Sequence, residues 1–160
     1  MADFDKNRFA SKNQEWETPL GLFNPLNEEF HFTRDLACNE INKKVENGFT
    51  EKDNALSKDW DGVNWLNPPY NKVKNWVMKA YHDTNKLNSV VVMLIQCRTN
   101  TNWWHEFVMN AKEVRFIKGR PKFKGNKHGL PLPLAIVVFA KHSEATKYSQ
   151  QTFEKEGSLK

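Results

Sequence analysis

The feature that most constrains the fold of this chain is the unbroken apolar run Val90–Ile95. It is far shorter than the roughly 20 residues that a membrane span needs. It also lacks the polar alternation of a half-exposed strand, so it predicts a strand buried on both faces of a sheet. Such a strand requires helices on both sides. One of them is predicted over residues 73–81, where apolar residues recur at the spacing of an amphipathic helix: Val73, Trp76, Val77, Ala80 and Tyr81.

Strands and helices are predicted to alternate along the rest of the chain. Further strands are predicted over residues 30–35, 63–66, 113–118 and 134–140, and a further helix over residues 102–111. Another helix is expected to begin at Thr18, with Thr18 as its cap and Pro19 in its first turn, and Pro25 is expected to bend or shorten it. This order predicts an open α/β sheet, which binds ligands outside the carboxyl ends of its strands.

The chain of 160 residues has the length of one domain. We expect that domain to span residues 15–142. The segments 1–14 and 143–160 are polar, and we expect them to be flexible ends.

Positive charge is concentrated in one segment. The net charge is +5, and residues 111–130 contain seven Lys and Arg side chains against the single acid Glu113, so the remaining 140 residues sum to −1. A local cluster of this kind indicates phosphate contact more strongly than net charge alone. The alternative is a solvated loop that keeps the protein in solution.

Cysteine and histidine usage argues against several classes of protein. Cys38 and Cys97 are the two cysteines and have no C-x-x-C spacing, so neither a disulfide framework nor a cysteine zinc site is expected. The five histidines lack metal-ligand spacing, and we expect no metal. The N-terminus has no apolar signal-peptide core, which favours a soluble, cytoplasmic protein that does not enter a membrane.

The candidate catalytic loop is Asn67-Pro68-Pro69-Tyr70, directly after the strand predicted over residues 63–66. Two prolines stiffen the loop and remove two backbone donors, which leaves acceptors: the Asn67 side-chain oxygen and the Pro68 carbonyl. Two acceptors that hold both N–H groups of a conjugated amine would free its lone pair for attack, and Tyr70 offers a face for stacking a planar base. The alternative is an ordinary strand stop followed by a turn.

Other motifs flank this loop in a fixed order. They are Trp16-Glu17-Thr18-Pro19, Asp35-Leu36-Ala37-Cys38, Asp53-Asn54-Ala55-Leu56, Arg98-Thr99-Asn100-Thr101 and Phe116-Ile117-Lys118-Gly119-Arg120. Together with Asn67–Tyr70, the set resembles the small phage DNA N-6-adenine methyltransferase (Dam) family. The resemblance implies a single-domain class I methyltransferase-like (Rossmann-like) α/β sheet flanked by helices, S-adenosylmethionine as cofactor and DNA as partner. For a phage-encoded protein it also implies the host cytoplasm.

The resemblance also implies a set of cofactor-binding residues: Trp16, Thr18, Pro19, Asp35, Ala37, Cys38, Asp53 and Asn67. In it, Asp35 begins a turn beneath the cofactor, Asp53 receives the cofactor's adenine amino group, and Thr18 closes over the methionine portion. The chain has no glycine-rich loop, but S-adenosylmethionine carries no phosphate for such a loop to bind. For Asp35 and Asp53, the alternative is helix capping.

The reaction that the resemblance implies is direct methyl transfer to adenine N6, with the base flipped out of the duplex and the proton lost to solvent. Phosphates would be held by basic residues: Arg98, Lys118, Arg120, Lys122, Lys124 and Lys127. The alternatives are the same chemistry on RNA, on cytosine N4 or on protein glutamine, and a non-catalytic nucleic-acid-binding relative. The sequence leaves the oligomeric state open. Trp103 and Trp104 are candidates for base stacking, but their helical spacing beside Phe107 favours core packing for at least one of them.

Overall fold

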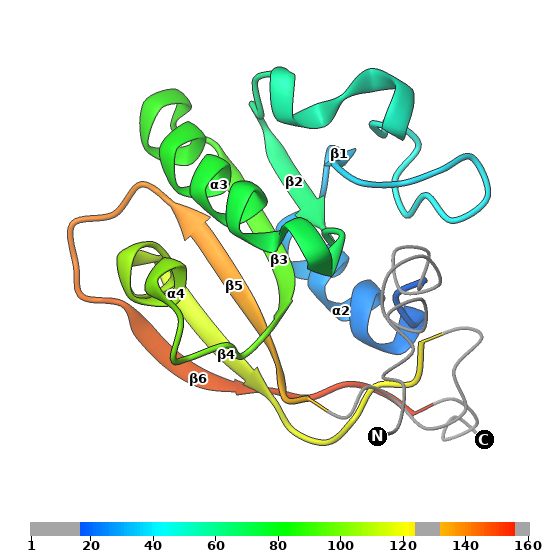
Figure 1. The fold of residues 1–160 in the computed structure, drawn as a ribbon. Coiled ribbons are helices and arrows are strands. Elements are labelled where there is room, and N and C mark those ends of the chain that lie inside the picture. Colours follow the sequence, from blue (N-terminus) through cyan, green and yellow to red (C-terminus); the bar gives the residue numbers. More distant parts are fainter. Residues whose placement is uncertain (1–16, 124–131, 156–160) are drawn as a thin grey trace, which may run out of the picture.

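The protein is built on one mixed sheet of six strands in the order β1-β2-β3-β5-β4-β6 (Figure 1). The structure is a computed structural model and describes residues 17–123 and 132–155. The strands are Arg34–Asp35 (β1), Val63–Leu66 (β2), Val90–Gln96 (β3), Glu113–Ile117 (β4), Leu134–Ala140 (β5) and Lys147–Gln151 (β6). The predictions of an α/β sheet and of strands over residues 63–66, 113–118 and 134–140 are confirmed.

Strand direction places most of the connecting loops at one edge of the sheet. β1, β2 and β3 are parallel, and β5 lies antiparallel between β3 and β4. β6 is parallel to β4. Every strand except β5 therefore ends at the same edge, which we call the carboxyl edge. The loops after β1, β2, β3 and β4 all leave the sheet there, where open α/β sheets bind their ligands.

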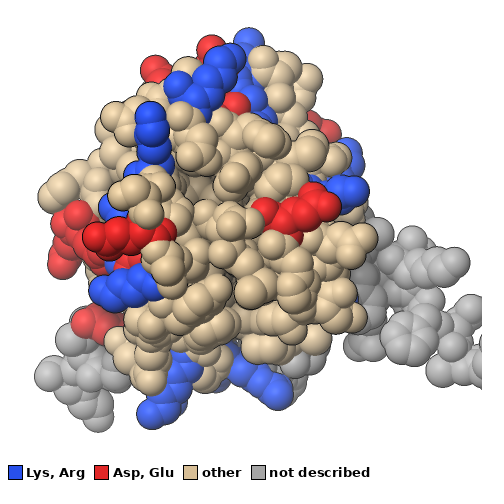
Figure 2. All heavy atoms as spheres, turned by 90° about the vertical axis from the view of Figure 1, so that its left-hand side faces the viewer, with Lys and Arg blue, Asp and Glu red and all other residues tan. Residues whose placement is uncertain are grey.

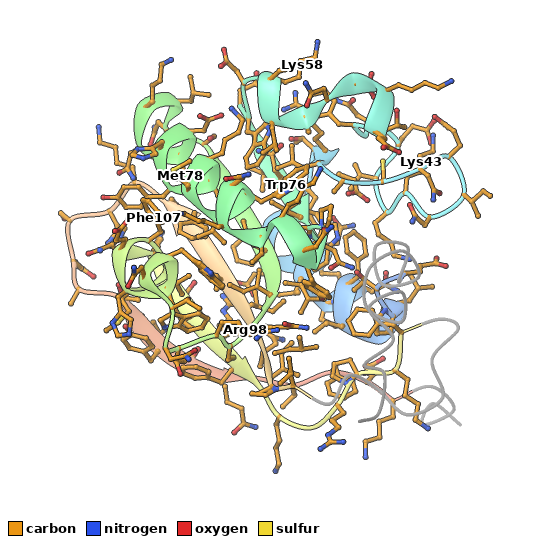
Figure 3. All side chains as sticks on the ribbon, in the orientation of Figure 1. Lys43, Lys58, Trp76, Met78, Arg98 and Phe107 are labelled. Carbon is orange, nitrogen blue, oxygen red and sulfur yellow. The ribbon has the colours of Figure 1, made fainter. Side chains whose placement is uncertain are left out.

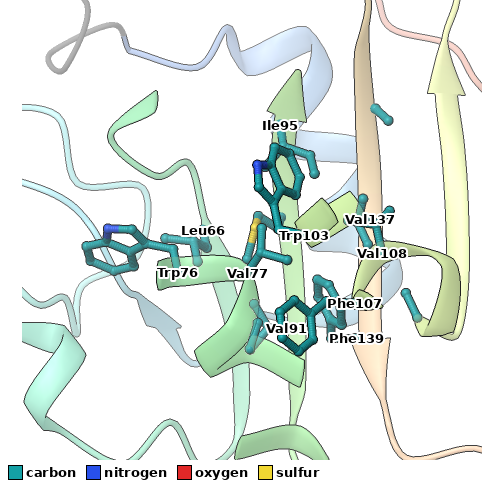
Figure 4. Close-up of a cluster of buried hydrophobic side chains, with 14 of the residues drawn as sticks. Leu66, Trp76, Val77, Val91, Ile95, Trp103, Phe107, Val108, Val137 and Phe139 are labelled. Atoms are coloured by element: carbon teal, nitrogen blue, oxygen red, sulfur yellow. The ribbon is translucent and has the colours of Figure 1, made fainter. Parts of the chain in front are cut away.

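Helices cover both faces of the sheet, as the Val90–Ile95 run requires. The α-helices are Leu20–Phe30 (α2), Val73–Leu87 (α3) and Asn102–Glu106 (α4), and the single helical turns are Glu51–Asp53 (η2), Ala55–Ser57 (η3), Tyr70–Lys72 (η4) and Val108–Asn110 (η5). On β3, Val91 and Ile95 join the core under α3 and α4, whereas Val92 and Leu94 join the core under α2. Figure 4 shows the first of these cores, in which Trp76 lies beside Leu66 and Trp103 beside Ile95. Of the helices in the described residues, none is both long enough and apolar enough for a membrane span.

The helix predicted over residues 102–111 is divided into α4 and η5. Thr101 caps α4, because its hydroxyl accepts a hydrogen bond from the Trp104 N–H at 3.3 Å. Trp103 and Trp104 are 9% and 4% exposed and belong to the core. The packing role weighed for these two residues therefore holds for both.

The strand predicted over residues 30–35 is mostly wrong. α2 continues through Phe30 and ends where His31 adopts the left-handed conformation, with φ 55°. The Asn27 side chain then accepts a hydrogen bond from the Phe32 N–H at 3.1 Å. Only Arg34 and Asp35 pair with β2. Phe32 is nevertheless buried, so its apolar character reflects the core under α2 rather than a strand.

The polar tail predicted as flexible contains β6 and is joined to α2. Pro25 lies inside α2 and has no N–H to donate to the Gly21 carbonyl. That carbonyl instead accepts a hydrogen bond from the Glu154 N–H at 3.1 Å. A Cβ on residue 21 would lie 2.0 Å from the Glu154 carbonyl oxygen, so glycine is required for this approach. Pro25 therefore does not end α2. Because it has no N–H, it leaves the Gly21 carbonyl as an acceptor for the Glu154 N–H.

This contact yields a prediction about stability. Replacing a glycine within a helix by alanine normally raises the free energy of unfolding by about 0.5–1 kcal/mol. For Gly21→Ala we expect the opposite, a loss of about 1–3 kcal/mol, because the new Cβ displaces the backbone at Glu154. At this chain length that corresponds to a decrease in Tm of about 2–10 °C, measured by thermal unfolding.

The control for Gly21→Ala is Asn24→Ala, an exposed position in the same helix. There alanine only improves helix propensity, and Tm is expected to remain unchanged or to rise slightly. A Gly21→Ala protein with a Tm equal to that of Asn24→Ala would show that the joint between α2 and the C-terminal segment does not stabilise the fold.

Candidate active site

The loop Asn67–Tyr70 leaves the sheet at the carboxyl edge, between the loops that follow β1 and β3. A hydrogen bond of 3.0 Å from the Leu36 N–H to the Trp65 carbonyl joins the loop after β1 to the last residues of β2. Pro68 is buried, and Pro69 leads directly into η4 and α3. A loop follows β2 as predicted, and strand order puts it in the middle of three parallel strand ends.

Thr18 contacts Asn67 instead of capping a helix. The Asn67 Nδ2 group donates a hydrogen bond to Thr18 Oγ1 at 3.1 Å. Thr18 is 3% exposed. The cap residue of α2 is Pro19, which makes no side-chain cap contact, so the predicted capping role of Thr18 is wrong. Trp16, the other N-terminal residue predicted to bind cofactor, lies outside the described residues.

The Asp35 carboxylate holds the loop that follows β1. One oxygen accepts a hydrogen bond from the Ala37 N–H at 3.2 Å and the other from the Lys44 N–H at 3.0 Å. The backbone of Asp35 is in turn bonded to Asn47 and Phe49, which closes the loop on itself. Burial raises the pKa of Asp35 to about 6, although these N–H groups favour its ionised form. A buried carboxylate thus organises the loop after β1.

Carboxylates dominate the electrostatics around Cys38 in the same loop. Burial, followed by the charges of Asp35 and Glu40, raises the pKa of the Cys38 thiol to about 12, and Asp53 acts in the same direction. Lys43 has the opposite effect. The thiol is therefore protonated and unreactive at neutral pH. Three of the four charges that act on this thiol are therefore carboxylates.

Asp53 is exposed and caps a helical turn. Its Oδ2 accepts hydrogen bonds from the N–H and the hydroxyl of Thr50, at 2.8 and 3.1 Å, at the start of η2. These bonds lower the pKa of Asp53. The capping alternative weighed for Asp53 is confirmed, although its influence on Cys38 places it near the loop after β1.

A cavity of about 230 Å³ opens on the other side of the candidate catalytic loop, between the segments that follow β2 and β3. It is lined by Tyr70, Val73, Gln96, Arg98, Thr101 and Trp103. Arg98 Nε donates a hydrogen bond to Gln96 Oε1 at 3.1 Å, which orients both side chains. Figure 3 shows Arg98 where the chain leaves β3, below α3 and α4.

Tyr70 and Trp103 contribute aromatic surface to this cavity. Burial raises the pKa of the Tyr70 hydroxyl, and among the described residues this hydroxyl has no hydrogen-bond partner. Trp103 packs in the core and also lines the cavity, so the two interpretations weighed for it do not exclude each other. Gln96 is not among the residues that the sequence motifs indicate. Its position as the first polar residue after the apolar run of β3 is the signal that could have identified it.

Four of the predicted basic residues lie at the carboxyl edge: Arg98 after β3, and three residues after β4. Lys118, Arg120 and Lys122 follow β4 and are exposed, and in the described part of the chain none of them takes part in an ion pair. In Figure 2, Lys and Arg side chains project at the lower end of the molecule, the end where β4 terminates in Figure 1; others lie at the upper end and on the flanks, together with Asp and Glu side chains. Lys124 and Lys127 lie outside the described residues.

Arg115 belongs to the same basic segment but has a structural role. Its guanidinium forms two hydrogen bonds with the Glu29 carboxylate, at 2.8 and 2.6 Å, and contacts Glu113 at 3.1 Å. It therefore joins β4 to α2. No cluster of potential metal ligands is found within residues 17–123 and 132–155.

The arrangement agrees with the comparisons to known proteins. Residues 6–152 match the family model described as DNA N-6-adenine-methyltransferase (Dam). A DNA N-6-adenine-methyltransferase of Haemophilus phage HP1 (strain HP1c1) is 35% identical over 127 residues, which cover 77% of this chain and 73% of the relative. A DNA N-6-adenine-methyltransferase of Escherichia phage T1 is 33% identical over 128 residues, which cover 76% of this chain and 53% of the relative.

Proposed function

Because this chain belongs to the Dam family of DNA N-6-adenine-methyltransferases, we propose that it transfers a methyl group from S-adenosylmethionine to N6 of an adenine in DNA. The observation that carries the assignment of the site is the position of Asn67–Tyr70 at the carboxyl edge. The loop has the segment after β1, with the carboxylates of Asp35 and Glu40, on one side and the cavity on the other. The donor is assigned to the first side and the acceptor base to the second.

The residues of the loop after β1 suit the proposed cofactor. When bound, S-adenosylmethionine supplies a methyl group that is already activated on a positively charged sulfonium. Asp35, Glu40 and Asp53 all raise the pKa of Cys38, so the same potential favours a cationic sulfonium and ammonium. We assign cofactor contacts to Asp35, Ala37, Cys38 and Pro19, in agreement with the family resemblance.

Asn67 and Pro68 are assigned to the acceptor amine. With Nδ2 directed to Thr18, the Asn67 Oδ1 lies on the opposite side of the carboxamide. This oxygen and the Pro68 carbonyl are the proposed acceptors for the two N–H groups of adenine N6, which draw its lone pair out of conjugation. Tyr70 supplies the stacking face on the cavity side. The contribution of the protein is alignment and polarisation, and no side chain needs to act as a nucleophile.

The experiment that tests this function supplies the protein with methyl-labelled S-adenosylmethionine and unmethylated DNA, followed by digestion to nucleosides. Label in N6-methyladenine is expected. Label in N4-methylcytosine, or in RNA or protein offered in place of DNA, would show that the enzyme methylates an acceptor other than adenine in DNA. A protein that binds DNA but neither binds nor consumes the donor would be a non-catalytic relative.

The basic residues at the carboxyl edge are assigned to DNA phosphates, and they give a prediction about salt dependence. When the logarithm of the DNA-binding constant is plotted against the logarithm of the salt concentration, each phosphate contact adds about 0.9 to the steepness of the decline. We expect the combined Ala replacement of Lys118, Arg120 and Lys122 to lower that slope by about 2–3 and to weaken DNA binding about 10- to 100-fold at low salt. Fluorescence anisotropy titrations at several salt concentrations measure both values.

A matched control removes the same charge elsewhere. Lys58, Lys86 and Lys141 are also exposed. Lys86 precedes β3 and Lys141 follows β5, so both lie at the opposite edge of the sheet, and Figure 3 shows Lys58 far from Arg98. Their combined Ala replacement should leave the slope nearly unchanged. Equal slopes for the two triple variants would show that the basic segment does not contact phosphates and is only a solvated surface.

A further inference from the structure

We propose that Phe116 and Tyr148, the aromatic pair, form a stacking surface for unpaired DNA bases beside the target adenine. The two rings are nearly parallel, with 10° between their planes and 6.2 Å between their centroids. They are 42% and 50% exposed, although phenylalanine is among the residue types most often buried. This inference rests on the proposed DNA substrate and extends the binding surface beyond the candidate catalytic loop and the cavity.

Strand register places Phe116 on the face of the sheet where Trp103 lines the cavity. Phe116 of β4 pairs with Ala135 of β5, and Ala135 pairs with Ile95 of β3. Paired residues point to the same face, and both Ala135 and Ile95 belong to the core under α3 and α4. Trp103 lies beside Ile95 in Figure 4. Two strand spacings of about 4.8 Å therefore separate Phe116 from the row position next to the cavity, a distance of about 10 Å.

Tyr148 shares this face and lies further from the cavity. It pairs with Val114 of β4, which also belongs to the core under α3 and α4. β6 is the last strand of the sheet, and neither ring of the aromatic pair belongs to a core. Aromatic side chains thus follow one another along the sheet, from Trp103 in the cavity wall to Phe116 and Tyr148 at the surface.

Positive charge on the same face selects DNA as the occupant. The Lys118 N–H donates a hydrogen bond to the Gln151 carbonyl at 3.2 Å, which continues the pairing of β4 with β6 by one residue. Alternation then puts Lys118 on the face of Phe116. Lys118, Arg120 and Lys122 are exposed, and none of them is in an ion pair within the described ranges. Rings beside such cations are the combination that binds single-stranded nucleic acid, in which bases stack on the rings and phosphates contact the cations.

The proposed reaction supplies unpaired bases near this surface. An adenine that is flipped into the cavity leaves its partner base unpaired and loses its own stacking neighbours. One strand of a duplex advances about 3.4 Å per nucleotide, so the distance of about 10 Å corresponds to about three nucleotides. Stacking on the aromatic pair would replace part of the base stacking that is lost when the duplex opens at the target.

A second copy of this chain is the other occupant that exposed rings at the edge of a sheet would suit. In a symmetric dimer the same patch lies on both sides of the interface. Lys118 and the basic residues after it would then approach their own copies. The acid of β4, Glu113, does not compensate for this charge, because it pairs with Val138 of the core under α2 and so points to the other face. Charge therefore favours DNA.

The first test compares binding to a fully paired duplex with binding to the same duplex carrying a short mismatched segment. In Phe116→Thr/Tyr148→Thr the rings are replaced by strand-forming side chains without aromatic surface. We expect this double variant to lose about 10- to 100-fold in affinity for the mismatched duplex and less than about twofold for the paired one. Fluorescence anisotropy in the absence of donor measures both values. Equal losses on the two duplexes, or no loss on either, would overturn the inference.

The second test separates stacking from phosphate contact. Phe116→Thr/Tyr148→Thr removes no charge, so the steepness of the salt dependence should stay within about 0.5 of the wild type, while affinity for the mismatched duplex is lower at every salt concentration. Combined Ala replacement of Lys118, Arg120 and Lys122 is expected to lower the steepness instead. A decrease of about 2 in the aromatic variant would show that the rings only position the basic residues, and it would overturn the inference.

Two controls accompany the double variant. Phe116→Tyr/Tyr148→Phe exchanges the two ring types and should keep the wild-type affinity, because each ring can still stack. Met78→Ala/Met109→Ala removes side chains that are 38% and 44% exposed and should also bind both duplexes as the wild type does. Met109 precedes β4 at the opposite edge of the sheet, and Figure 3 shows Met78 away from Arg98. If Phe116→Thr/Tyr148→Thr fails to fold, Tyr148→Thr alone, on the edge strand, gives the same comparison with an expected loss of about 5- to 10-fold.

The outcomes separate this inference from the proposed function. A folded wild-type protein that transfers no methyl group to DNA contradicts the proposed function. An active wild type whose Phe116→Thr/Tyr148→Thr variant binds both duplexes as before overturns the inference alone, as does an equal loss of affinity in Phe116→Tyr/Tyr148→Phe. Sedimentation velocity tests for the second copy. A wild-type dimer that becomes a monomer in Phe116→Thr/Tyr148→Thr would assign the rings to self-association and overturn the inference.

Discussion

Asn67→Ala is expected to lower kcat about 10²- to 10³-fold, the effect of removing one preorganised hydrogen-bonding group at a reacting centre. The variant loses Oδ1, the proposed acceptor for one N–H of the target amine, together with the bond to Thr18. Affinity for S-adenosylmethionine should change little, because most of its proposed contacts lie in the loop after β1. Single-turnover kinetics and isothermal titration calorimetry measure the two effects separately.

Asn67→Asp is the matched control, because it keeps an oxygen at the position of Oδ1 and a second oxygen that accepts a hydrogen bond from the Thr18 hydroxyl. We expect it to retain far more activity than Asn67→Ala. If Asn67→Ala turned over at the wild-type rate, the assignment of Asn67–Tyr70 as the site of methyl transfer would be wrong.

Stability should depend on pH through Asp35, with a sign unusual for a carboxylate. Its pKa is raised from 3.8 to about 6 in the folded protein. Between these values the folded state binds more protons than the unfolded state, so stability falls as pH rises from about 4 to about 6. Above pH 6 the decrease in the free energy of unfolding levels off at about 3 kcal/mol, from 1.36 kcal/mol for each unit by which the pKa of Asp35 is raised.

The measurement is the difference in unfolding free energy between the wild type and Asp35→Asn, determined by urea unfolding from pH 3.5 to pH 7.5. The difference should become less favourable to the wild type as pH rises and should level off above pH 6. Asp53→Asn is the control of opposite sign, because the pKa of Asp53 is lowered by Thr50. The stability that Asp53 contributes is present above the ordinary pKa of an aspartate and is lost as pH falls below it. Parallel curves for the two variants would contradict the burial of the Asp35 charge.

The parts of the fold that were predicted correctly have strong local patterns. The Val90–Ile95 run has no interpretation as a half-exposed element, and the spacing from Val73 to Tyr81 fits one face of a helix. Pro68 and Pro69 end β2 for covalent reasons that no tertiary contact can override. These three features are sufficient to place the candidate catalytic loop at a strand end beside a helix.

The errors arose where a tertiary contact competes with a local pattern. Thr18 fits a helix cap, but its hydroxyl bonds to Asn67, a residue far along the chain. Charge counting cannot show that Arg115 is paired with Glu29 on another element. The strand β6 is at the edge of the sheet and three of its five residues are exposed, so its composition is that of a tail. The family match, which extends to residue 152, includes it.

The candidate site was only half predictable for a similar reason. Asn67, Thr18 and Asp35 carry recognisable motifs, but their mutual contacts depend on strand order. Gln96 and Thr101 line the cavity only because the end of β3 lies beside the end of β2. No pattern in the sequence specifies that neighbour relation before the sheet is known.

The hydrogen bond between Glu154 and Gly21 has a consequence for the order of folding. It connects α2 with the segment that follows β6, so nearly every described strand and helix lies in the loop of chain that this bond closes. Closing so long a loop costs chain entropy before any contact compensates for it. The joint between Gly21 and Glu154 is therefore expected to form late and slowly.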